Sequence, residues 1–229
     1  MGFGGRSGSA RPKVKILREH ASRPSPVHVA IALAWLIPAG LQAQGSKTIV
    51  GIVGGYGTTE QIWRPTTVAE DVGGLIVGAW VRAATPLGWL SIRAEGAYTQ
   101  RGGDVVSDVA GQPVNGGIRS DYVTIALDGR ATLGLGPVRL HVAAGPSFDV
   151  LIRSRLDQTL APVLQQEGTA VFGVQAGVGL GVQVTERVFV EVEARIHEGL
   201  GDAYSGDFLS VRNRSREVVI RVGVPLPAR

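Results

Sequence analysis

The sequence predicts an all-β fold, an eight-stranded antiparallel up-and-down transmembrane β-barrel preceded by a signal peptide. Apolar runs with a period of two recur from Lys47 onward, and no amphipathic helical stretch of convincing length interrupts them. The connections between these runs are alternately long and short. A basic stretch and a short apolar run precede the first of them.

The leader comes first, in residues 1–43. Six Lys and Arg residues precede the run "VHVAIALAWLIPAGLQAQ", which is too short to span a bilayer as a helix and ends in small residues. This order is typical of a secretory signal peptide. We expect cleavage after Ala43, so that residues 44–229 form one barrel domain, since no linker divides them.

The net positive charge of the chain comes from this leader. The full sequence has a formal charge of +4, but the leader holds six of the 23 Lys and Arg and one of the 19 Asp and Glu, so the remainder carries about −1. Nucleic acid requires a clustered basic surface, and we expect no such partner. The absence of Cys fits an exported protein without disulfides.

Eight alternating runs form the expected strands. In order, they are residues 47–56, 73–85, 89–102, 121–134, 138–152, 169–183, 188–200 and 215–226. Short turns are expected at Pro86–Gly88, Leu135–Pro137 and Val184–Arg187, and long connections at 56–72, 103–120, 153–168 and 200–214. This rhythm predicts a barrel with both termini on the short-turn side and four long extracellular loops on the other.

The two faces of these strands differ in charge. In residues 188–200, Glu191, Glu193, Arg195 and His197 alternate with Val190, Val192, Ala194 and Ile196. Across the strands the polar face carries Arg82, Arg93, Arg130, Arg139, Arg195 and Arg221 against Glu95, Asp128, Asp149, Glu191, Glu193 and Glu217. Mixed charges can pair inside a narrow barrel, so we expect a charge-filled lumen that is not an open pore, with the apolar face toward outer membrane lipid.

Aromatic residues are few, at 6% of the chain. We expect five residues to contribute to the aromatic girdles of a membrane barrel: Trp89, Tyr98, Tyr122, Phe148 and Phe172.

A soluble periplasmic barrel of lipocalin type is the main alternative. It would place the apolar face inside and the charges outside, and alternation alone does not separate the two. The leader, the four long connections on one side and strands of at least about 9–11 residues favour the membrane.

The sequence predicts no catalytic, cofactor-binding or metal site. The glycine-rich run 173–182 is followed by a turn and a strand, unlike a dinucleotide-binding loop, so we expect small inward residues facing bulky neighbours. His197 has no second His at metal-ligand spacing. An enzyme that modifies the acyl chains of lipid A would need Ser, His and an acid on the lipid-facing rim. His141 and His197 instead have inward parity, so we expect buried, hydrogen-bonded histidines and no enzyme.

Three segments carry a family resemblance: "LSIRAEGAYTQRGG", "SDYVTIALDGRATLG" and "VRLHVAAGPSFDVLI". They resemble the central hairpins of the PorT-like and opacity-like family of small Gram-negative outer membrane β-barrels, called porin-family proteins but mostly without a defined activity. The chain departs from that family in ending "VPLPAR" rather than in an aromatic residue. We expect a monomer with a structural or surface-binding role, whose four long loops meet the outside. Its partners would be outer membrane lipid, the outer membrane assembly machinery and an extracellular ligand at the loops.

Overall fold

The computed structural model describes residues 48–64, 69–109, 112–158, 160, 164, 166–206 and 210–227. The expected signal peptide, residues 1–43, lies outside them. Among the described residues, no helix is long and apolar enough to cross a membrane. The regular structure that they form is entirely β-strand.

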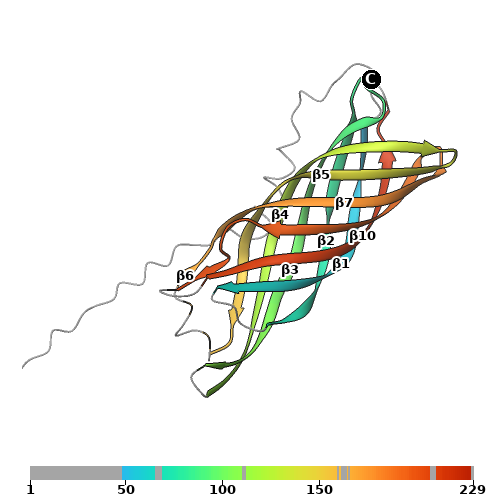
Figure 1. Ribbon diagram of the computed structural model, residues 1–229. Helices are drawn as coiled ribbons and strands as arrows, with labels where there is room; N and C mark the ends of the chain where they lie inside the picture. Colours follow the sequence, from blue (N-terminus) through green and yellow to red (C-terminus); the bar gives the residue numbers. More distant parts are fainter. Residues whose placement is uncertain are drawn as a thin grey trace, which may run out of the picture. The chain divides into compact units, whose positions relative to one another are not determined.

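Eight long strands form one closed antiparallel wall (Figure 1). They are β1 (Thr48–Arg64), β2 (Ala69–Ala84), β3 (Leu90–Val109), β4 (Gln112–Leu135), β5 (Val138–Leu156), β7 (Ala170–Thr185), β8 (Val188–Gly199) and β10 (Ser210–Pro225). Each pairs with the next, and β10 pairs with β1 from Ile49↔Pro225 to Arg64↔Ser210. This closure confirms the predicted eight-stranded up-and-down barrel.

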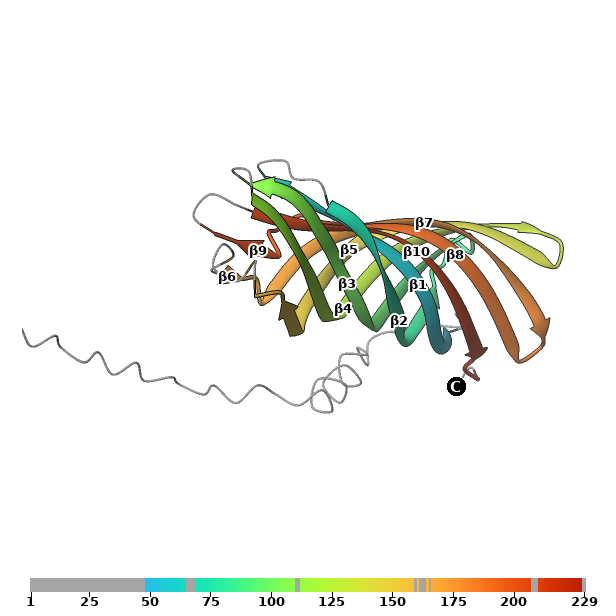
Figure 2. The ribbon, with the colours of Figure 1, turned by 90° about the horizontal axis from the view of Figure 1, so that it is seen from below.

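Two short strands, β6 (Gln166–Glu167) and β9 (Tyr204–Ser205), pair with each other, and β9 also pairs with the start of β10. They lie at the end of the barrel opposite the C-terminal end of β10 (Figure 2). We call their end the mouth.

The three short turns lie where the sequence predicts them, at the end opposite the mouth. Gly88 and Gly136 have a φ of 69°, a backbone conformation that glycine adopts without strain. Leu226 N donates a hydrogen bond of 2.7 Å to Thr48 O, so the start of β1 and the end of β10 also meet at this end.

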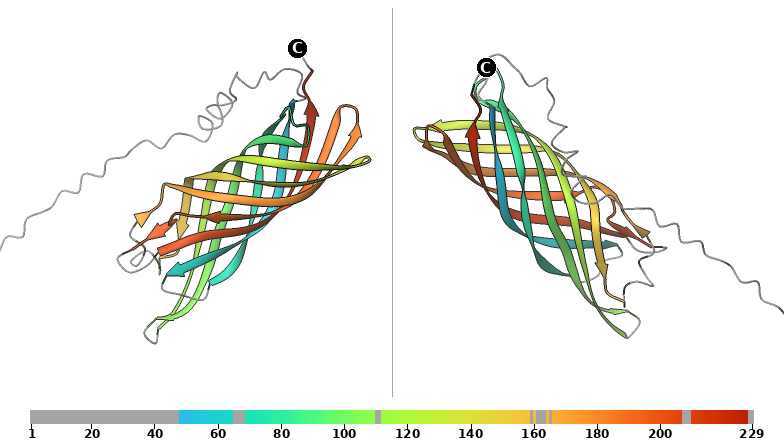
Figure 3. Two further views of the ribbon diagram at one scale, coloured as in Figure 1. Left: turned by 45° about the horizontal axis from the view of Figure 1, so that its top comes forward. Right: turned by 180° about the vertical axis from the view of Figure 1, so that it is seen from behind.

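The strands extend further toward the mouth than the sequence predicts. Most of the expected connection 56–72 is strand, because β1 continues to Arg64 and β2 begins at Ala69. The expected connection 103–120 is almost entirely a β3–β4 ladder, which reaches Val109↔Gln112 (Figure 3). Ladder hydrogen bonds need no apolar face, so pairing continues where the alternation fades.

Alternate residues of each strand face the interior and the surroundings. On β8, Glu191, Glu193, Arg195 and His197 are buried, and Val192 and Ile196 are exposed. The exposed apolar row recurs on every long strand, for example Ile52 on β1 with 67% of its surface exposed. A lipocalin-type barrel would have the opposite arrangement, so the soluble alternative is wrong.

Two apolar clusters inside the barrel were not predicted. The mouth cluster comprises Trp63, Val105, Ile118, Leu160, Leu164, Val171, Ala203, Tyr204 and Val211. The wall cluster comprises Ile49, Val53, Ile76, Trp80, Ala97, Phe189 and Val219. Apart from Leu160, Leu164 and Ala203, which lie between strands, these residues have inward parity, so periodicity marks their side of the strand without revealing that they form a core.

Candidate functional site

The candidate site is the set of ionisable side chains buried inside the barrel, which we call the interior charge network. Its members are Arg82, Arg93, Arg101, Arg130, Arg195, Arg221, Glu95, Asp128, Asp149, Glu191, Glu193, Glu217, His141 and His197. Arginines and carboxylates are thus equal in number. Arg139, expected among them, is exposed because it is the second residue of β5, beside the turn. Arg101 of β3, nearer the mouth, also lies inside.

Arg93 connects opposite walls of the barrel. Its Nη2 lies 2.7 Å from Oδ2 of Asp128, its partner on the adjacent strand β4. Its Nη1 and Nη2 donate to Glu193 on β8 at 2.7 and 3.0 Å. Since β3 and β8 are not neighbours in the sheet, these bonds cross the interior.

Glu191 and Glu95 each collect several guanidinium groups. Glu191 Oε2 lies 2.7 Å from Arg130 Nη2 and 3.3 Å from Arg82 Nη1. Glu95 is contacted by Arg195 at 2.6 Å and by Arg221 at 2.7 Å. These buried charges are therefore all close to opposite charges, which offsets the cost of removing them from water.

Toward the mouth, the network gives way to polar and then apolar groups. Arg101 pairs with Asp149, which also accepts a bond of 2.6 Å from Thr124 Oγ1. The hydroxyl of Tyr204, in the mouth cluster, lies 2.5 Å from Ser120 Oγ and 2.9 Å from Ser154 Oγ. These contacts attach β9 to the inner side of β4 and β5.

Inward glycines on β7 provide room for this network. A Cβ at Gly179 would lie 2.5 Å from His141 Cε1, and one at Gly181 would lie 2.5 Å from Phe189 Cζ. A Cβ at Gly177 would lie 2.9 Å from Arg195 Cβ. The prediction that the glycine-rich run faces bulky neighbours is confirmed.

The only metal-like grouping among the described residues does not fit a metal. Ligand atoms of His141, Glu191 and Glu193 lie within 4.8 Å of one another. However, Arg93 and Arg221 contact both carboxylates. A divalent cation at this position would lie beside these guanidinium groups and be repelled by them.

A Ser–His–acid grouping is also present, without the geometry of a catalytic triad. Ser147 Oγ and Asp149 Oδ2 both approach Nε2 of His197, at 2.9 and 3.4 Å. A triad needs the acid at the other ring nitrogen, where it orients the imidazole for the serine. All three side chains are buried inside the barrel.

The expected aromatic residues divide between the two faces. Phe148 and Phe172 are exposed on the outer wall, Tyr98 is half-buried there, and Trp89 is exposed in the turn before β3. Tyr122 is wrong as a girdle residue, since it is fully buried and accepts a bond of 3.2 Å from Asn213 Nδ2. Its inward parity places it in the lumen.

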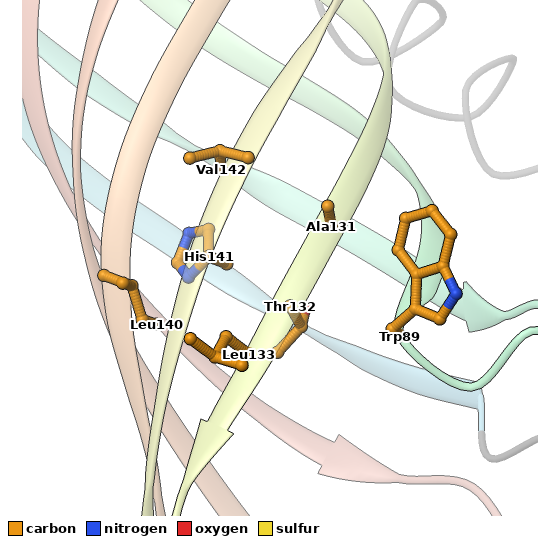
Figure 4. A pocket seen from close by; sticks show the side chains of 7 residues that line it. All are labelled: Trp89, Ala131, Thr132, Leu133, Leu140, His141 and Val142. Carbon is orange, nitrogen blue, oxygen red and sulfur yellow. The ribbon is translucent and has the colours of Figure 1, made fainter.

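A shallow hollow of about 210 Å³ lies near the short turns (Figure 4). Its lining residues are Trp89, Ala131, Thr132, Leu133, Leu140, His141 and Val142. Thr132 N donates to Trp89 O at 2.8 Å, which connects the turn before β3 to β4. The mainly apolar lining offers no set of convergent polar groups for a polar substrate.

Comparisons with known proteins place the chain in a family. Residues 46–205 match the model of the outer membrane protein beta-barrel domain. Similar solved structures include Neisserial surface protein A (13% identity, TM-score 0.47, covering 78% of this chain and 99% of that one). Ail of Yersinia pestis, in complex with the heparin analogue sucrose octasulfate, shows 12% identity and a TM-score of 0.42, with 79% and 99% coverage.

The N-terminal barrel domain of Pseudomonas aeruginosa OprF shows 15% identity and a TM-score of 0.32, with 78% and 98% coverage. No curated protein matches the chain. The family model covers well over half of the sequence, and its match agrees with the closed barrel and the outward apolar rows. The protein is thus an outer membrane protein, and it belongs to the outer membrane protein beta-barrel domain family.

Proposed function

We propose that this barrel is closed to solutes and has a structural or surface-binding role. The observation that carries the proposal is the set of ion pairs from Arg93 to Asp128 and Glu193, which joins β3 to the opposite wall. An eight-stranded barrel has an interior about wide enough for side chains alone.

The mouth cluster supports the same proposal. Trp63, Tyr204 and Val211 are almost completely buried at the end of the lumen. An ion entering there would have to leave water beside apolar side chains before it reached the charges, which is costly.

Conductance across planar bilayers tests the proposal. We expect no steady conductance from the inserted protein, because paired side chains occupy the lumen. Insertion is verified in parallel by resistance of the barrel to added protease. Reproducible open-channel steps from inserted protein would show that solutes pass.

We further infer that residues 1–43 direct export and are removed. The outer membrane assembly machinery would then insert the barrel as a monomer, with the mouth and its loops outside the cell.

The orientation of the barrel can be tested by thiol labelling at its two ends. Gln158 lies near the mouth, and Glu186 lies in a short turn at the other end; both are exposed. In a chain without native Cys, Gln158→Cys should react with an impermeant maleimide on intact cells, and Glu186→Cys only after permeabilisation. The reverse pattern would invert the orientation.

We also propose that the protein is not an enzyme, since His141 and His197 are buried inside the barrel rather than at its lipid-facing rim. Purified protein should release no fatty acid from phospholipid or lipid A. Hydrolysis that is lost in Ser147→Ala would contradict this.

A further inference from the structure

The outer surface changes from apolar to charged at a defined level below the mouth. On β10 the exposed row Val224, Val222, Ile220 and Val218 is followed by Arg216. On β5, Phe148 and Val150 are followed by Arg153 and Arg155, after a register shift that turns both arginines outward. Arginine is therefore the first charged residue beyond the apolar row on both strands.

Two carboxylates near this level, Glu198 and Asp104, have partners within the protein. Glu198 accepts a bond of 2.5 Å from Arg214 Nε, and Asp104 accepts one of 2.8 Å from Arg119 Nη1. The bond from Arg119 holds the pKa of Asp104 below its ordinary value. These acidic side chains are thus already matched by guanidinium groups.

Three outward arginines, Arg153, Arg155 and Arg216, have no such bonded partner. All three are exposed, and within the described ranges no hydrogen bond or ion pair joins their side chains to another residue. The neighbours of Arg216 on β1 and β8 are Thr58 and Ile196, neither of them acidic.

On β4, Arg155 faces Arg119, and Arg153 faces Asp121. Gln100 Nε2 also approaches Asp121, at 3.5 Å. Beside Arg119, Arg153 and Arg155, the negative charges are those of Asp104, Asp121 and Asp157, which is exposed two residues beyond Arg155.

We propose that Arg153, Arg155 and Arg216 bind the phosphate groups of outer-leaflet lipid. A guanidinium group matches phosphate through two parallel hydrogen bonds. Its aliphatic stem can lie along the apolar wall while the charged end reaches the headgroups. Continuity with the lipid-facing rows of β5 and β10 selects a membrane lipid over a soluble polyanion. The assignment to the outer leaflet rests on the proposed orientation.

The chain offers matched controls at the opposite end. Arg139 and Arg187 are also exposed arginines, but they lie beside the short turns. Changing them to Gln removes the same type of charge without affecting the proposed site.

The test uses the folded full barrel in detergent, with bound lipid counted by native mass spectrometry during titration with diphosphorylated lipid A. We expect Arg216→Gln to weaken binding about fivefold, and Arg153→Gln/Arg155→Gln/Arg216→Gln to weaken it about a hundredfold. Arg139→Gln/Arg187→Gln should leave binding unchanged. Added salt should weaken the wild-type interaction.

Three results would overturn the proposal. These are equal binding of dephosphorylated lipid A, an equal loss in the Arg139→Gln/Arg187→Gln control, and equal competition by a soluble sugar phosphate without acyl chains. Binding in detergent depends on neither conductance nor orientation, so failure here leaves the closed barrel intact. If the protein binds lipid A as expected but Gln158→Cys reacts only after permeabilisation, the assignment of the site to the outer leaflet is wrong.

Discussion

Arg93 shows what a single residue contributes to this interior. It is 1% exposed and contacts Asp128, Glu191 and Glu193. Replacing it with Met should destabilise the barrel by about 3–5 kcal/mol, because three buried carboxylates lose a counterion. Urea unfolding in lipid vesicles measures the change. Exposed Arg139→Met should stay within about 0.5 kcal/mol of wild type, and equal effects of the two changes would contradict the network.

The polar rows could be predicted residue by residue because successive side chains in a strand alternate between faces. Parity alone does not determine depth, which is why Arg139, at the end of its strand, lies outside the network. It also does not identify contacts across the lumen. The pairing of Arg93 with Glu193 depends on the stagger of eight strands, which no local pattern encodes.

Among the elements, the turn between β4 and β5 depends most clearly on one residue type. Gly136 has a φ of 69°, so Gly136→Ala should cost about 1–2 kcal/mol of stability. Gly134→Ala is the matched control, since its Cβ would meet no atom within 4 Å and its φ is not positive. The same urea titration compares them, and an unchanged midpoint for Gly136→Ala would refute the strained turn.

The sequence predicted these short turns well and the mouth poorly. Gly and Pro mark the two turns at Pro86–Gly88 and Leu135–Pro137 directly. Near the mouth, the charged segment from Asp104 to Arg119 reads as a loop, yet the ladder continues through it. The pattern of exposed apolar residues therefore marks the lipid-facing band rather than the length of the strands.

For the whole molecule, closure of β10 on β1 leaves the wall with no free edge among the described long strands. We expect the unboiled protein to migrate faster than the boiled protein in a denaturing gel, because a closed ladder resists detergent. Identical mobility before and after boiling would contradict a closed barrel.

The number of strands was predictable from the alternating connections, whereas the two interior apolar clusters appeared only once the strands were placed around a common lumen.

Quenching of tryptophan fluorescence by lipids with brominated chains tests most directly which face meets the membrane. A chain that begins at Gln44 contains three tryptophans: Trp63 and Trp80 are 5% and 4% exposed, and Trp89 is 56% exposed in the turn before β3. We expect little quenching of the Trp89→Phe variant, and strong quenching when Leu127→Trp, which lies on the outer face of β4, is added to that variant. Strong quenching of Trp63 and Trp80 in Trp89→Phe, with none gained from Leu127→Trp, would show that the charged rows face outward and contradict the account.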